Sequence, residues 1–180
     1  KILKKKTNKD YIILPSLQSI FYIKHKLKNN SINIGAQNCS QYSNGAYTGD
    51  VSAAMIKELG CKYVLLGHSE RRSLYKEDKK ELRLKVINAI KNKLKIIFCV
   101  GESLSDYKKR NTKKIITMQL TGMFNKKVNF KNVVIAYEPV WATPLWRETH
   151  DLAVFIANST EDFLNKFGGK KLGIITISSF

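Results

Sequence analysis

Residues 61–72 read CKYVLLGHSERR, and the features that decide the fold lie within this stretch. Its residues 63–66 form a continuous apolar run, which is typical of a strand buried on both faces of a parallel sheet. Gly67 then permits a tight exit from the strand, and His68 stands where a new helical turn can begin. The stretch therefore predicts a buried strand, a sharp turn and a helix in immediate succession.

Comparable runs recur along the chain, with helical patterns between them. Apolar residues such as Leu82, Val86 and Ile90 fall at helical spacing, while Ser52 and Gly60 stand where a helix would begin and end. The alternation predicts repeated βα units and hence an α/β fold with a parallel sheet. The predicted strands are residues 11–14, 32–36, 63–66, 96–100, 133–137 and 172–177.

A parallel sheet either closes into a barrel or stays open with helices on both faces. Open sheets usually carry a glycine-rich phosphate-binding turn after their first strand. Neither G-x-G-x-x-G nor G-x-x-x-x-G-K-[ST] occurs in this chain. Composition and periodicity leave both architectures open, so the residues at the strand ends carry the decision.

The length of 180 residues and the 43% hydrophobic content predict one folded domain with a core of its own. No apolar run approaches the length of about 18 residues that a membrane span needs, and no signal peptide is visible, so we expect no membrane partner. The three cysteines lack the spacing of disulfide frameworks or zinc sites, which favours reduced thiols in an intracellular protein and no metal.

The charge balance is strongly basic, with 32 Lys and Arg against 14 Asp and Glu and a formal net charge of +18. Such an excess is one signature of nucleic-acid-binding proteins. Here it is mostly lysine, spread over every segment and accompanied by abundant Asn and Ile, as a biased proteome composition would produce. We therefore expect solvated basic faces and no nucleic-acid partner, and keep a basic nucleic-acid binder as an alternative.

Two strand ends carry side chains suited to catalysis, and catalytic groups in parallel α/β folds come from the carboxyl ends of strands. His68 follows the strand at 63–66, and the positive end of a helix would favour its neutral imidazole, which can donate a hydrogen bond to a carbonyl. Glu138 follows the strand at 133–137, and Pro139 holds its backbone extended. A carboxylate fixed in this way predicts a general base.

Together these segments resemble the triosephosphate isomerase family over residues 10–142. The stretches that match it in order and spacing are GAQNC (35–39), NGAYTGD (44–50), CKYVLLGHSERR (61–72), CVGE (99–102) and AYEPVWA (136–142). The resemblance implies a (β/α)8 barrel, of which residues 10–142 would supply the second to sixth strands. It also implies that residues 1–180 form one truncated barrel domain, with the first and last units missing or divergent.

The resemblance implies a function as well. The family interconverts dihydroxyacetone phosphate and D-glyceraldehyde 3-phosphate in glycolysis and gluconeogenesis, in the cytoplasm and without metal or organic cofactor. Glu138 would be the catalytic base, His68 the electrophile that stabilises an enediolate, and Glu70 a supporting carboxylate at the rim. Thr48 would lie at the tip of the loop that reaches into the partner's active site in a homodimer, and Ser179 would contact the substrate phosphate.

The chain also departs from the family pattern at three places. Residues 1–9 contain no counterpart of the catalytic lysine, which would stabilise negative charge, and residues 143–146 stand where a glycine-containing lid would follow. The phosphate-binding glycines are absent around residues 172–179. A second hypothesis is therefore a truncated, catalytically inactive paralogue that retains part of the barrel and the dimer loop as a binding or structural protein.

Overall fold

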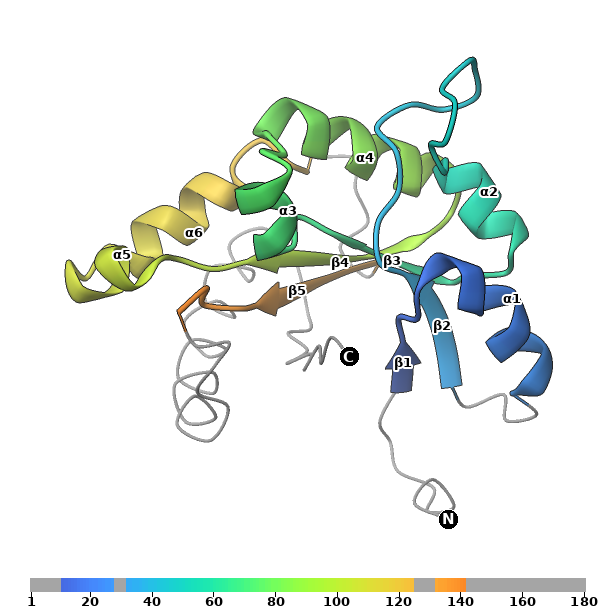
Figure 1. Cartoon of the computed structure of the whole chain (residues 1–180). Coiled ribbons are helices and arrows are strands. Elements are labelled where there is room, and N and C mark those ends of the chain that lie inside the picture. Colours follow the sequence, from blue (N-terminus) through green and yellow to red (C-terminus); the bar gives the residue numbers. More distant parts are fainter. Residues whose placement is uncertain (1–10, 28–31, 125–131, 142–180) are drawn as a thin grey trace, which may run out of the picture.

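The structure is a computed structural model that describes residues 11–27, 32–124 and 132–141. Within these residues, parallel strands alternate with helices along the chain (Figure 1). The elements are β1 (Tyr11–Ile13), α1 (Leu17–Lys26), β2 (Ile32–Ala36), α2 (Ala53–Glu58), β3 (Tyr63–Leu66), α3 (Ser69–Leu74), α4 (Lys79–Lys91), β4 (Lys95–Val100), α5 (Leu104–Lys108), α6 (Thr112–Leu120) and β5 (Val133–Tyr137).

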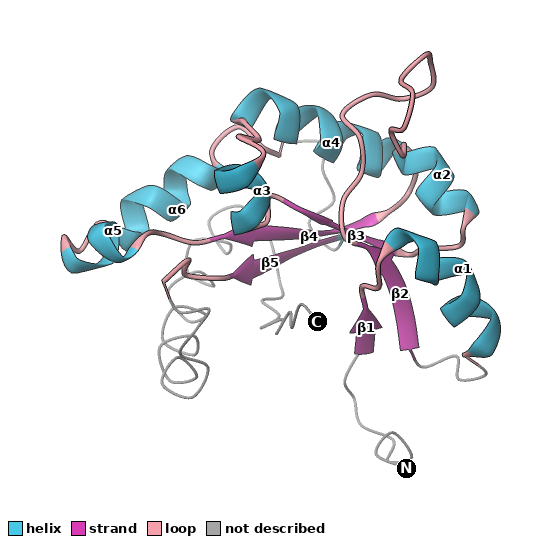
Figure 2. Ribbon diagram, in the orientation of Figure 1, coloured by secondary structure: helices cyan, strands magenta, loops and turns pink. Residues whose placement is uncertain are grey.

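The strands pair in the order β1-β2-β3-β4-β5, and every pair is parallel. Each strand therefore lies beside the next one along the chain, without the reversal of order that marks an open, doubly wound sheet. The helices gather over one side of this sheet, as Figure 2 shows. This is the arrangement of a (β/α)8 barrel, and the described part of the chain forms a curved portion of one. The barrel prediction is confirmed.

The predicted strands agree closely with the observed ones. The runs at 32–36, 63–66 and 133–137 are strands over those same residues. The first strand ends at Ile13, one residue early, and the fourth begins at Lys95, one residue early. Lys95 is exposed and lies outside the apolar run, but its backbone pairs with that of Tyr63, so the ladder includes it. The predicted strand at 172–177 lies outside the described residues.

The sheet has two apolar faces, which explains why its strands read as continuous apolar runs. Residues such as Val64, Leu66 and Phe98 pack toward the helices in one buried cluster. Their neighbours Leu65 and Ile97 belong to a separate buried cluster on the other face, inside the curve of the sheet. Successive side chains of a strand point to opposite faces, so both sets must be apolar when both faces are buried.

The helix boundaries follow the signals in the sequence. The Ser52 hydroxyl accepts a hydrogen bond from the backbone N–H of Met55, at 3.2 Å, and caps α2. Gly60, at φ +81°, takes the left-handed conformation that ends this helix before β3. Among the described helices, none is long and apolar enough to cross a membrane.

Candidate active site

The carboxyl ends of β3 and β5 bring His68 and Glu138 together. Nε2 of His68 lies 3.3 Å from Oε2 of Glu138, and the two side chains are 19% and 21% exposed. β4 lies between β3 and β5 in the sheet, so the two residues approach each other across the end of that strand. The structure thus places two side chains that were singled out separately in one partly buried site.

The position of His68 at the start of α3 fixes which nitrogen faces Glu138. His68 is the N-cap residue, and its Nδ1 accepts a hydrogen bond from the backbone N–H of Glu70 at 3.4 Å. A nitrogen that accepts a hydrogen bond carries no proton, so the neutral ring bears its proton on Nε2. The Nε2–H group therefore points into the site as a hydrogen-bond donor.

The surroundings of Glu138 raise its pKa. Burial raises the pKa of Glu138 above its ordinary value, and the charge of Glu70 raises it further, whereas His68 and a hydrogen bond with the Cys99 thiol lower it. Burial prevails. Oε2 of Glu138 is buried and, among the described residues, has no hydrogen bond of good geometry, with Nε2 of His68 facing it at 3.3 Å. A carboxylate oxygen that is not engaged in a hydrogen bond of good geometry is available to take a proton from a substrate.

The side chain of Glu70 lies beside His68. Its side chain is 62% exposed, and its Oε2 lies 3.6 Å from Nδ1 of His68. The carboxylate is therefore a neighbour of the imidazole on the side that faces away from Glu138.

Arg72 connects the carboxyl end of β3 to β4, next to this site. The sequence pattern did not identify it. Its Nε donates to the carbonyl of Gly67 at 2.7 Å, and Nη2 donates to the carbonyl of Cys99 at 3.2 Å. Gly67 directly precedes His68, and Cys99 contacts Glu138. Burial lowers the pKa of Arg72, while Cys99 and Glu77 raise it. One guanidinium thus links the backbones that support both candidate catalytic groups.

Glu102 is a second residue that sequence reasoning did not identify. Its side chain is almost completely buried after β4, and the Tyr137 hydroxyl donates to it, at 2.9 Å from both carboxylate oxygens. Thr112 and Trp141 also donate to Oε1, at 3.2 and 3.4 Å. Burial and the adjacent Glu102 raise the pKa of Tyr137. Since Tyr137 and Trp141 flank Glu138 in the chain, Glu102 anchors the segment that carries it.

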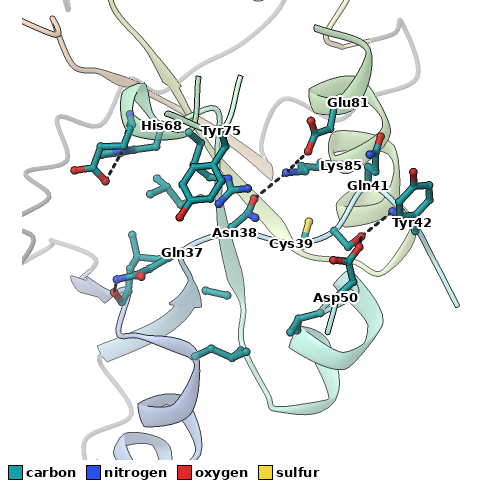
Figure 3. A pocket seen from close by; sticks show the side chains of 18 of the residues that line it. Gln37, Asn38, Cys39, Gln41, Tyr42, Asp50, His68, Tyr75, Glu81 and Lys85 are labelled. Atoms are coloured by element: carbon teal, nitrogen blue, oxygen red, sulfur yellow. Dashed lines mark hydrogen bonds and ion pairs between the residues drawn. The ribbon is translucent and has the colours of Figure 1, made fainter. Parts of the chain in front are cut away.

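A cavity of about 820 Å³ opens beside His68 (Figure 3). The loop between β2 and α2 supplies much of its wall, including Asn38 and Asp50, and His68 and Glu70 lie at its border. Thr48 is exposed in the same loop, which projects beyond the helices in Figure 1. Within this chain the structure does not bring Thr48 to His68 and Glu138.

A buried ion-pair cluster forms another wall of the cavity and corrects the expectation that lysines occupy solvated faces. Lys85 is 2% exposed and pairs with Glu77, whose side chain is fully buried, and with Glu81 at 2.9 Å. Arg71 also binds Glu77, at 2.9 Å between Nε and Oε1. Lys85 lies on the face of α4 that carries Leu82, so its burial follows from its helical position.

The remaining site predictions fall elsewhere. Ser179 lies outside the described residues, as do residues 1–9 and 143–146. Among the residues that the structure describes, no group of three or more His, Cys, Asp or Glu side chains is placed to hold a metal ion.

Comparison with known proteins identifies the family. The family model for triosephosphate isomerase matches residues 1–144. The triosephosphate isomerase of Mesomycoplasma hyopneumoniae strain 232 is 44% identical over 137 residues, covering 76% of this chain and 56% of that protein. That of Dictyostelium discoideum is 36% identical over 178 residues, covering 94% of this chain and 68% of that protein. The chain thus spans about half to two thirds of the length of these relatives.

The structural comparison agrees with the sequence comparison. The crystal structure of triosephosphate isomerase from Bartonella henselae matches with a TM-score of 0.74 and 34% identity, covering 88% of this chain and 67% of that one. Because the family model matches most of the chain and the fold agrees, this chain belongs to the triosephosphate isomerase family.

Proposed function

We propose that the site interconverts dihydroxyacetone phosphate and D-glyceraldehyde 3-phosphate, with Glu138 as the base. The observation that carries the proposal is the pairing of Nε2 of His68 with Oε2 of Glu138 at 3.3 Å, at the carboxyl ends of β3 and β5. A substrate carbon placed against the carboxylate would have its oxygens next to the imidazole. The family to which the chain belongs supplies the reaction that such a pair can perform.

The chemistry follows from the protonation states. The Glu138 carboxylate removes a proton from C1 of dihydroxyacetone phosphate, and the electron pair of that C–H bond moves to form the enediolate. The Nε2–H of His68 donates a hydrogen bond to the substrate oxygens and stabilises the negative charge that develops there. A proton then passes from O1 to O2, the two substrate oxygens that face His68. Glu138 returns its proton to C2, and the electron pair left on O1 forms the C1 carbonyl of the aldehyde. A raised pKa makes the carboxylate a stronger base, which helps it to deprotonate a weak carbon acid.

The supporting residues belong to the same proposal. Glu70 would act from the rim on the Nδ1 side of His68. Ser179 stays a prediction for the phosphate contact, and the single truncated barrel domain over residues 1–180 and the cytoplasmic location stay predictions as well. The contacts around Glu138 favour the isomerase over the inactive paralogue, because Arg72 binds the carbonyl of Cys99, which contacts Glu138, and Glu102 binds Tyr137, the residue before Glu138.

We also propose that two copies of the chain form a dimer through the loop that carries Thr48. Thr48 is exposed in this loop, Tyr42 and Tyr47 stack within it at 3.9 Å between ring centroids, and the cavity beside His68 is open. A partner's loop would fill that cavity. Sedimentation of the wild-type chain and of Thr48→Arg tests this: a dimer that the substitution dissociates is expected, and a wild-type monomer would contradict it.

The activity is tested on the chain itself. We expect isomerisation of D-glyceraldehyde 3-phosphate by the wild-type chain, and a fall of about 10²- to 10⁴-fold in Glu138→Gln, because the amide cannot accept the proton. The variant purified in the same way controls for contaminating host isomerase. Equal rates for both proteins, at the level of the buffer, would contradict the proposal.

A further inference from the structure

Gly101, the first residue after β4, lies directly against the backbone of Glu138. A Cβ atom added to Gly101 would stand 1.8 Å from the carbonyl oxygen of Glu138 and 2.5 Å from its carbonyl carbon. No real Cβ atom tolerates such distances, so only glycine permits this contact. The N–H of Glu138 also donates to the carbonyl of Val100 at 2.7 Å. The backbone of Glu138 therefore rests on residues 100 and 101, and its position depends on theirs.

Gly101 is in turn held by a side chain from a different element. The carboxamide of Gln119, on α6, accepts a hydrogen bond from the Gly101 N–H at 2.9 Å through Oε1. Its Nε2 donates to the Gly101 carbonyl at 2.8 Å. Both polar groups of one peptide residue are thus satisfied by a single planar amide, which restrains Gly101 in direction as well as in distance.

The helix that carries Gln119 is itself fixed. Ile116 and Leu120 of α6 are buried in the cluster that Phe98 and Val100 of β4 also join. A cavity of about 230 Å³ borders Gln119, Gly101 and Glu138. Because this space lies beside Glu138, packing alone does not fix its position. The hydrogen bonds between Gln119 and Gly101 therefore contribute more to holding the Glu138 backbone in place.

We propose that Gln119 is a positioning residue for the base, acting on Glu138 through Gly101. The inference rests on the proposed role of Glu138 in the reaction and extends it to a residue that touches no substrate. Displacement of a reacting group by about 1 Å can cost about 10²-fold in rate, so a clamp on the backbone beneath the base affects turnover without contributing chemistry. We expect substrate binding not to depend on it.

The test uses Gln119→Met, which keeps the length of the side chain and removes both hydrogen bonds. Gln119→Glu is the second variant, because it keeps the acceptor for the Gly101 N–H but opposes the Gly101 carbonyl with a carboxylate. Thr121→Ala is the matched control, since it removes a hydrogen bond to the Thr117 carbonyl at the end of α6 and leaves Gly101 untouched. All three are compared with the wild-type chain.

Two readouts separate positioning from a general loss of structure. The first is amide hydrogen exchange at Glu138, whose N–H does not touch Gln119. We expect it to exchange at least about tenfold faster in Gln119→Met and Gln119→Glu, while amides in the centre of β3 keep the wild-type rate. The second is isomerase kinetics, in which kcat is expected to fall about 10- to 100-fold with KM unchanged, and Thr121→Ala is expected to retain both constants.

The outcomes distinguish the two proposals. Unchanged exchange at Glu138, or equal acceleration at every amide, would overturn the positioning role whatever the kinetics show. A wild-type chain without isomerase activity would contradict the proposed function of this chain, while selective exchange at Glu138 would still support the clamp. A rise in KM with constant kcat would also overturn the inference, because it would place Gln119 in substrate binding.

Discussion

The imidazole of His68 faces the carboxylate of Glu138 with Nε2 3.3 Å from Oε2, although the elements from α3 to β5 separate the two residues in the sequence. The contact exists because β3 and β5 are the two neighbours of β4 and all three run parallel, so their carboxyl ends meet. Arg72 and Gly101 then fix the backbones on either side. Substitutions at these residues and the pH dependence of the chain test this arrangement.

The pH dependence of activity follows from the raised pKa of Glu138. The base must be ionised, so the rate is expected to rise with pH until the pH exceeds the pKa of Glu138, which burial places above that of an ordinary carboxyl group. The acidic limb of kcat/KM against pH is therefore expected above the ordinary glutamate value. A limb at or below that value would contradict the assigned burial effect.

The same carboxyl group makes the stability of the fold fall as pH rises, whereas activity rises with pH. Between the ordinary and the raised pKa the folded chain binds more protons than the unfolded chain, so stability is lost as pH rises through this window. Glu138→Gln removes that loss. Denaturant unfolding at several pH values is expected to show the variant gaining stability over the wild type as pH rises, and a constant difference would contradict this.

Arg72 is expected to contribute to the stability of the fold. Arg72→Met leaves the carbonyls of Gly67 and Cys99 without their donor and is expected to lower the free energy of unfolding by about 2 kcal/mol. The exposed Arg83 on α4 offers a control, because Arg83→Met is expected to stay within about 0.5 kcal/mol of the wild type. Equal effects of the two substitutions in urea unfolding would show that Arg72 does not join the strands.

Glu102 is expected to be sensitive even to an isosteric change. Glu102→Gln places an NH₂ group among the donors of Tyr137, Thr112 and Trp141, and we expect a loss of about 1–3 kcal/mol in unfolding free energy. Thr112→Ala removes one donor only and is expected to cost about 1 kcal/mol. If Glu102→Gln were as stable as the wild type, the carboxylate would not be the anchor of the Glu138 segment.

The buried cation of α4 gives a double-mutant test. Lys85→Met removes a partner of the buried Glu77 and is expected to cost about 3 kcal/mol, since an incompletely compensated charge stays inside. Adding Glu77→Met is expected to recover part of that loss. Chemical denaturation of the two single variants and the double variant measures their coupling free energy, and strict additivity would contradict a direct pairing.

Much of the fold could be predicted from the sequence because burial on both faces leaves a strong local signal. The strands at 32–36, 63–66 and 133–137 are continuous apolar runs, and Gly60 stands where its helix ends. The placement of His68 and Glu138 at strand ends was also predictable, since topology alone brings such positions to one edge. The start of β4 was missed by one residue because pairing of Lys95 is a backbone property.

The supporting residues could not be predicted in the same way. Gln119, Arg72 and Glu102 act through contacts between distant elements, and on their own helices or loops they look like ordinary polar positions. Lys85 is different, because its spacing from Leu82 places it on the buried face of α4. That spacing was the one available signal, and it conflicts with the usual exposure of lysine.

Proton abstraction from the substrate carbon by Glu138 can be measured by solvent exchange. Dihydroxyacetone phosphate is incubated with the chain in D₂O, and deuterium at C1 is followed by ¹H NMR, with Glu138→Gln prepared in parallel. We expect the wild-type chain to introduce deuterium at C1 and the variant to do so about 10²- to 10⁴-fold more slowly. Exchange at the same rate in both proteins would show that Glu138 is not the base.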